Sequence, residues 1–165
     1  MTSKNSPSLG ILHLERGVPV GAAPPKPAAP GAVLNPATFD FPVIVETVEG
    51  AWVENVVRGD PTLEPAFIAA ARRLVERGAA AISSTCGFSI RHQPAVAASV
   101  QVPVAMSSLL LLPMLLRQLP PKAKIAVLTY DAVHFGDDLF GFDDPVERAR
   151  VVVGASKVAS SGMTN

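Results

Sequence analysis

Short apolar segments alternate along this chain with segments of helical periodicity, and this alternation is the feature that most constrains its fold. Strands are predicted over residues 9–14, 42–48, 79–83, 102–106 and 124–129, which are rich in β-branched or small apolar side chains. Strands and helices that alternate through short connections form a parallel sheet covered by helices on both faces. We therefore predict an α/β fold with an open parallel sheet of about four strands.

Three helical segments separate these strands. The first begins after Thr62, a plausible N-cap, and ends at Gly78. Its apolar side chains recur at helical spacing and form one face. They are Phe67, Ala70, Ala71, Leu74 and Val75. A second helix, or a pair of short ones, follows Cys86 and is interrupted at Pro94, and a third covers residues 108–119.

Two irregular segments divide the chain further. Residues 17–36 contain six prolines, and repeated proline excludes both a helix and a central strand there. This segment is interpreted as a surface loop, or as a loop that lies over a site. Residues 155–165 are polar, have no periodic apolar face and are predicted to be disordered. The remaining chain, residues 1–154, is predicted to be one α/β lobe.

Composition excludes several classes of protein. Fourteen basic and fourteen acidic residues cancel and are scattered, so no nucleic-acid or anionic-membrane footprint is present. A lone cysteine excludes an intrachain disulfide framework and a CxxC site. The N-terminus lacks the apolar core of a signal peptide, and the most apolar stretch, residues 104–116, is shorter than the roughly 20 residues of a membrane span. We expect a soluble, cytoplasmic protein with no membrane or nucleic-acid partner.

The lone cysteine, Cys86, comes directly after a predicted strand and before a helix. Ligands of open parallel sheets bind at the carboxyl ends of the strands. The helix N-terminus is expected to lower the pKa of the thiol and to favour thiolate. A carboxylate could accept hydrogen bonds from the N–H groups of Gly87 and Phe88. The alternative interpretation is that Cys86 is a small buried apolar residue.

Four segments, taken in order, resemble the aspartate/glutamate/hydantoin racemase superfamily, and in particular its aspartate/glutamate racemase-like members. They are NPATFDFPV (35–43), STCGF (84–88), PVAMSSLLLLPMLL (103–116) and KIAVLTY (124–130). The resemblance covers residues 9–154. It implies a racemase-like first lobe and a reaction that needs neither pyridoxal phosphate nor a metal.

In such enzymes two cysteines flank the α-carbon of the substrate, and Cys86 matches the first of them. The resemblance also implies hydroxyl and amide groups that bind the substrate carboxylate. These are Asn35, Ser84, Thr85, Ser107, Ser108 and Thr129. The sequence holds no second cysteine, so it resembles the first lobe of a two-lobed enzyme. Glu15 is the nearest candidate for the acidic residue that follows the first strand in this family.

Two functions follow from these residues. One is a cofactor-independent amino-acid racemase or isomerase acting on a small carboxylate, with Cys86 as one thiol acid/base. The alternative is a shortened, inactive relative that only binds a small carboxylate. A homodimer could bring a second catalytic group to the site. A cysteine hydrolase is less favoured, because no histidine or acid is placed by the sequence to activate the thiol.

The three histidines add no further site. His92 lies six positions after Cys86, about 240° around a helix, and is not expected to face the thiol. His13 lies in the first strand and is interpreted as a packing residue. His134 lies near Asp131, Asp137 and Asp138, but their spacing matches no standard metal site and a solvated loop is the preferred interpretation. No metal is predicted.

Overall fold

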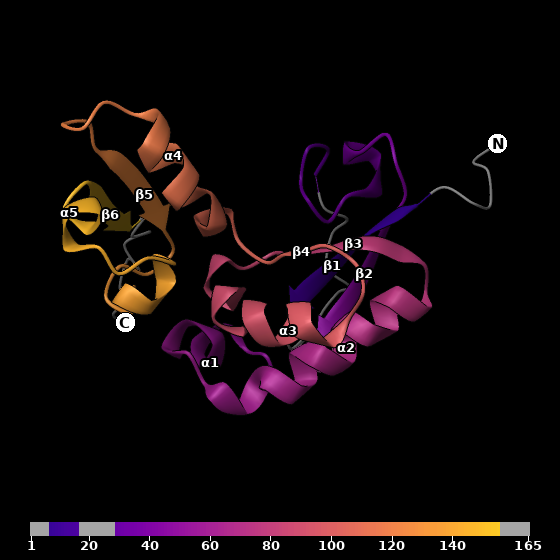
Figure 1. Cartoon of the computed structure of the whole chain (residues 1–165). Coiled ribbons are helices and arrows are strands. Elements are labelled where there is room, and N and C mark those ends of the chain that lie inside the picture. The colour runs from indigo at the N-terminus through magenta and orange to yellow at the C-terminus, as the bar shows by residue number, and fades with distance from the viewer. Residues whose placement is uncertain (1–6, 17–28, 156–165) are drawn as a thin grey trace, which may run out of the picture. The chain divides into compact units, whose positions relative to one another are not determined.

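The computed structural model describes residues 7–16 and 29–155, which form two compact units on either side of the Ser108–Leu109 bond (Figure 1). The sequence predicts a single lobe over residues 1–154. The segment after Ser108 leads into a second sheet. Most of the proline-rich segment and nearly all of the predicted polar tail lie outside the described residues. Ala155, the predicted start of that tail, is the last residue of a strand.

The first unit is built on a parallel sheet. Among the described residues it has four strands in the order β2-β1-β3-β4. They are β1 (Ser8–Leu14), β2 (Val43–Val48), β3 (Ala79–Ser84) and β4 (Val104–Ala105). The helices α2 (Glu64–Glu76) and α3 (Gln93–Ser99) pack against each other and along this sheet (Figure 1). The predicted α/β fold, a parallel sheet flanked by helices, is confirmed.

The core of this unit forms where α2 crosses the sheet. Ile11 and Leu12 of the central strand β1 are fully buried, and so are Phe67 and Leu74 of α2. A Cβ atom on Gly10 would lie 3.0 Å from Cβ of Ala79 and 3.1 Å from Cδ1 of Leu74. Glycine at this position therefore allows the helix to approach β1 closely.

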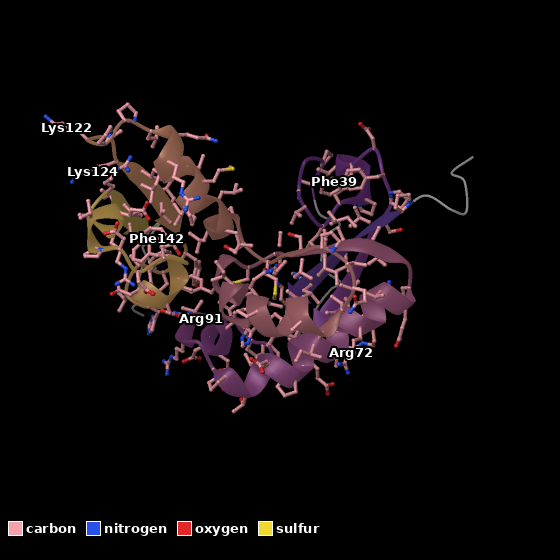
Figure 2. All side chains as sticks on the ribbon, viewed as in Figure 1. Phe39, Arg72, Arg91, Lys122, Lys124 and Phe142 are labelled. Atoms are coloured by element: carbon pink, nitrogen blue, oxygen red, sulfur yellow. The ribbon has the colours of Figure 1, made fainter. Side chains whose placement is uncertain are left out.

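The start of α2 differs from the prediction. Asp60, not Thr62, provides the capping side chain, because its Oδ1 accepts a hydrogen bond from the Thr62 N–H at 2.9 Å. This bond begins a 3-10 turn, Pro61–Leu63, which continues into α2. The predicted apolar face is correct for Phe67, Ala70, Ala71 and Leu74, which are all buried. Arg72 points away from the sheet on the outer side of the helix (Figure 2).

The segment after Cys86 forms a pair of short helices. A 3-10 helix, Gly87–His92, is followed by α3, which has Pro94 in its first turn. The edge strand β4 is shorter than predicted. The Gln93 side chain binds the backbone beside it, donating to the Val104 carbonyl at 2.8 Å and accepting from the Met106 N–H at 2.8 Å. One further helix of this unit, α1 (Val53–Arg58), was not predicted.

The second unit contains a smaller parallel sheet. A 3-10 turn, Ser108–Leu111, leads into α4 (Leu112–Gln118), where one continuous helix was predicted. The strands β5 (Ile125–Thr129) and β6 (Val151–Ala155) pair in parallel, and β6 was not predicted. The short helix α5 (Pro145–Arg148) precedes β6. Within the described part of the chain, no helix is both long and apolar enough to cross a bilayer.

Candidate functional site

The candidate site lies where β1 and β3 end, side by side, in the first unit. From β1 the chain passes to β2 on one side, and β3 then pairs with β1 on the other side. Such a reversal of strand order opens a crevice at the carboxyl ends of the strands. Cys86 follows the last residue of β3 by two positions. Its predicted location at this edge of the sheet is confirmed.

Two serines organise the backbone around the cysteine. The Ser84 hydroxyl oxygen accepts a hydrogen bond from the Cys86 N–H at 3.3 Å and lies 3.2 Å from the Ser89 hydroxyl. The Ser89 N–H donates to the Cys86 carbonyl at 3.0 Å, and Ser89 is fully buried. The turn that carries the thiol is therefore tied both to the end of β3 and to the helix that follows.

Burial raises the pKa of the Cys86 thiol. Hydrogen bonds from the Phe88 and Ser89 N–H groups and from the Ser89 hydroxyl act in the opposite direction, as does the charge of Arg91, but they do not outweigh desolvation. The expectation of a lowered pKa was therefore wrong. It assumed an open α-helix N-terminus, whereas Cys86 is half-buried and is followed by a 3-10 helix.

Thr85 connects the site to the neighbouring strand. Its N–H donates to the Leu12 carbonyl at 3.0 Å, which extends the pairing of β3 with β1 beyond Ser84. Its Oγ1 lies 3.0 Å from Nδ1 of His13. Burial, and then the positive charge of Arg16, lower the pKa of His13. His13 therefore makes a polar contact with the site, a role that the sequence interpretation of it as a packing residue missed.

Three other predicted residues, Gly87, Phe88 and Ser107, lie in or against the turn that follows the cysteine. A Cβ atom on Gly87 would lie 3.4 Å from Oγ of Ser107, so this hydroxyl faces the glycine backbone. Phe88 is buried, with the Arg91 guanidinium 5.6 Å from its ring centroid. Arg91, labelled in Figure 2, also donates to the Val57 carbonyl at 3.0 Å.

The remaining predicted residues are placed differently. The Asn35 side chain caps its own 3-10 turn by accepting from the Ala37 N–H at 2.9 Å. Ser108 begins the turn before α4. Thr129 ends β5, in the second unit. Glu15 accepts a hydrogen bond from the Gly50 N–H at 2.5 Å and holds the turn after β2.

The other two histidines contact residues outside the candidate site. His92 is buried and stacks on Phe67 at a centroid distance of 4.4 Å, and its Nε2 has no hydrogen-bond partner among the described residues. His134 pairs with Asp131 at 2.8 Å. Asp137 pairs with Arg148 at 2.7 Å. Across residues 7–16 and 29–155, no three His, Cys, Asp or Glu side chains converge as potential metal ligands.

Comparison with solved structures supports the predicted fold. The Gly74Cys mutant of arylmalonate decarboxylase in its sulfate ion associated form matches with a TM-score of 0.54 at 20% sequence identity. The match covers 94% of this chain and 64% of that chain. Arylmalonate decarboxylase is a member of the aspartate/glutamate racemase superfamily that the sequence resembles. No protein-family model matches the chain.

Among curated proteins, this chain is similar to dimethylsulfoniopropionate lyases. Dimethylsulfoniopropionate lyase 2 of Emiliania huxleyi is 33% identical over 111 residues, which are 60% of this chain and 31% of the relative. A dimethylsulfoniopropionate lyase of Durusdinium sp. clade D is 34% identical over 110 residues, 65% of this chain and 36% of the relative. Dimethylsulfoniopropionate lyase 7 of Emiliania huxleyi (strain CCMP1516) is 28% identical over 159 residues, which are 92% of this chain and 44% of the relative. The chain thus spans less than half the length of these relatives.

Proposed function

We propose that Cys86 is the thiol acid/base of a cofactor-independent site that removes a proton from the carbon next to a small carboxylate. The observation that carries this proposal is the position of Cys86 at the strand-order reversal, where its N–H donates to the Ser84 hydroxyl oxygen and Ser107 Oγ faces the adjoining Gly87. The Thr85 hydroxyl, on the preceding residue, contacts His13. Hydroxyl and backbone N–H groups are suitable donors to a carboxylate and to the negative charge that develops as the α-proton leaves.

The names of the curated relatives suggest dimethylsulfoniopropionate as the substrate. In the proposed reaction the Cys86 thiolate takes the proton from the carbon beside the carboxylate. The electron pair left on that carbon forms a C=C bond, and the C–S bond breaks with its pair going to sulfur. Acrylate and dimethyl sulfide leave, and the thiol returns its proton to water. Such an elimination requires only one base, so Cys86 can perform the proton transfer by itself.

The raised pKa of Cys86 sets the pH dependence of this reaction. Only the thiolate acts as a base, and near neutral pH the thiol form predominates. The rate should therefore rise as the pH increases toward the pKa of the thiol. A cationic sulfonium substrate bound nearby would favour the thiolate, because an opposite charge stabilises the ionised form.

The test compares the wild-type protein with Cys86→Ser and with a control, Ser83→Ala. Ser83 is also on β3, but its hydroxyl donates to the Ala105 carbonyl at 2.9 Å. Each protein is incubated with dimethylsulfoniopropionate in D₂O, and NMR measures deuterium at the carbon beside the carboxylate and the formation of acrylate. We expect acrylate from wild type and Ser83→Ala, with deuterium in the recovered substrate wherever the proton is returned before the C–S bond breaks, and neither signal from Cys86→Ser. An equal rate from Cys86→Ser would show that Cys86 is not the base.

Amino-acid racemisation is the second candidate, because the solved structure with this fold belongs to the racemase superfamily. Racemisation needs a second group to return the proton from the opposite face. With one thiol, aspartate should exchange its α-proton with retention of configuration, which NMR and chiral chromatography together detect.

The alternative without catalysis is a protein that only binds a small carboxylate. The raised pKa of Cys86 favours it, because a neutral thiol is a weak base. Binding of acrylate without exchange on either substrate would support this alternative and contradict the catalytic proposal.

A further inference from the structure

We propose that His13 is a positioning residue for the Thr85 hydroxyl, and that protonation of its imidazole fixes this hydroxyl as a hydrogen-bond donor to the ligand carboxylate. This inference rests on the proposed function, in which Thr85 faces a small carboxylate. It concerns a histidine that the resemblance to racemases does not include.

Strand pairing holds the two side chains together. The register of β1 and β3 places Leu12 opposite Ser84, and the bond from the Thr85 N–H to the Leu12 carbonyl continues that pairing by one residue. His13 and Thr85 are thus neighbours on adjacent strands, with Nδ1 and Oγ1 separated by 3.0 Å. Threonine is branched at Cβ, so its χ1 angle has little freedom. The position of Oγ1 is therefore well defined, and the direction of its hydrogen is the remaining variable.

The protonation state of His13 decides that direction. A hydroxyl has one hydrogen to donate and two lone pairs. When the neutral imidazole carries its hydrogen on Nε2, Nδ1 accepts the Thr85 hydrogen, and the hydroxyl presents only lone pairs to a carboxylate. When the imidazole is protonated, Nδ1–H donates to Oγ1 and the Thr85 hydrogen is free for the carboxylate. The imidazolium charge adds a second attraction.

In this proposal the protonation of His13 itself changes the direction of the Thr85 hydrogen, and the neighbouring groups do not. Two charged residues follow β1 directly. Glu15 accepts a hydrogen bond from the Gly50 N–H, and the charge of Arg16 opposes protonation of His13. On β2 the residue in register with His13 is Thr47, which is uncharged. Beyond the end of β3, the group that contacts His13 is the uncharged Thr85 hydroxyl.

The first measurement uses the free protein and does not depend on any activity. NMR follows the titration of the His13 ring in wild type and in Thr85→Val, which keeps the shape of the side chain and removes the hydroxyl. The imidazolium loses its acceptor in this variant, so we expect the pKa of His13 to fall further below its ordinary value. Ser83→Ala, whose hydroxyl binds elsewhere, serves as the control. An unchanged pKa in Thr85→Val would overturn the proposed coupling.

The second measurement is the affinity for propionate between about pH 8 and pH 5.5, a range in which the carboxylate stays ionised. We expect wild type to bind about tenfold more tightly at the lower pH, the gain typical of a hydrogen bond to an ionised group. His13→Gln can still donate to Thr85 but does not titrate, so its affinity should be independent of pH. A pH-independent affinity in wild type would overturn the inference while leaving the exchange assay to decide the proposed function. Conversely, the expected pH dependence without exchange or cleavage would support the role of His13 and reject the catalytic role of Cys86.

Discussion

His92 makes the stability of the first unit depend on pH. It is buried against Phe67, and desolvation lowers its pKa below the ordinary value of 6.5, with the charge of Arg91 acting in the same direction. Glu64 and Asp60 act in the opposite direction. Between the lowered folded pKa and 6.5 the unfolded chain binds a proton that the folded chain excludes. Stability is therefore fully present above pH 6.5 and is lost as the pH falls below it.

The size of this effect can be calculated for one histidine. If His92 stays neutral in the folded protein, proton uptake by the unfolded chain lowers the free energy of unfolding by about 1.4 kcal/mol between about pH 7.5 and pH 5.5. The two carboxylates make this an upper limit. The substitution His92→Leu removes the titrating group together with the buried Nε2 that has no partner among the described residues. It also removes the ring stacking, so a small net change is expected at the higher pH.

Urea unfolding of wild type and His92→Leu at the two pH values measures the effect. His13 is present in both proteins, so its contribution cancels in the difference. We expect wild type to lose about 1 kcal/mol more than the variant on acidification. Equal losses in the two proteins would refute the argument that a buried neutral His92 underlies this pH dependence.

Three further predictions concern the thiol and the core. Iodoacetamide should modify Cys86 more slowly than a free thiol at neutral pH, and faster as the pH rises, because burial raises the pKa of the thiol. Mass spectrometry measures the rate of modification. Faster modification in the folded protein than in urea-unfolded protein would contradict this prediction. Gly10→Ala should lower the free energy of unfolding by about 1–3 kcal/mol, because the new Cβ would crowd Ala79 and Leu74. Leu74→Ala should cost about 2–5 kcal/mol through the cavity it leaves, whereas Arg72→Ala on the outer face of α2 should leave the urea midpoint unchanged.

The sequence predicts those parts of the fold that depend on local pattern. The strands β1, β2 and β3 are short segments rich in apolar and β-branched residues, and the apolar face of α2 recurs at helical spacing. Short elements carry less signal. The helix α1 has six residues and no side-chain cap, and the run that forms β6 borders directly on the polar C-terminal segment.

The site was predictable in position but not in its electrostatics. Cys86 follows a strand and precedes a helix, and both facts are visible in the sequence. The sign of its pKa shift depends on how far other segments of the chain bury the sulfur. The sequence around Cys86 alone does not contain this information. The contact between His13 and Thr85 requires knowing that β1 and β3 are neighbours. Strand order is a property of the whole sheet, although polar residues near the carboxyl ends of two apolar strands, His13 in β1 and Ser84 in β3, are a signal that could have suggested it.

The central place of β1 has a consequence for synthesis on the ribosome. Its partner β3 is made long after it, since Ile11 pairs with Ser83. Until then only β2 is available, and one edge of an apolar strand is left without its hydrogen-bonding partner. Parallel pairing over such a separation is slow and leaves the nascent chain open to aggregation. Chaperone dependence should therefore be greatest for nascent chains that stall after β2 and before β3, and should fall once Ser84 has emerged.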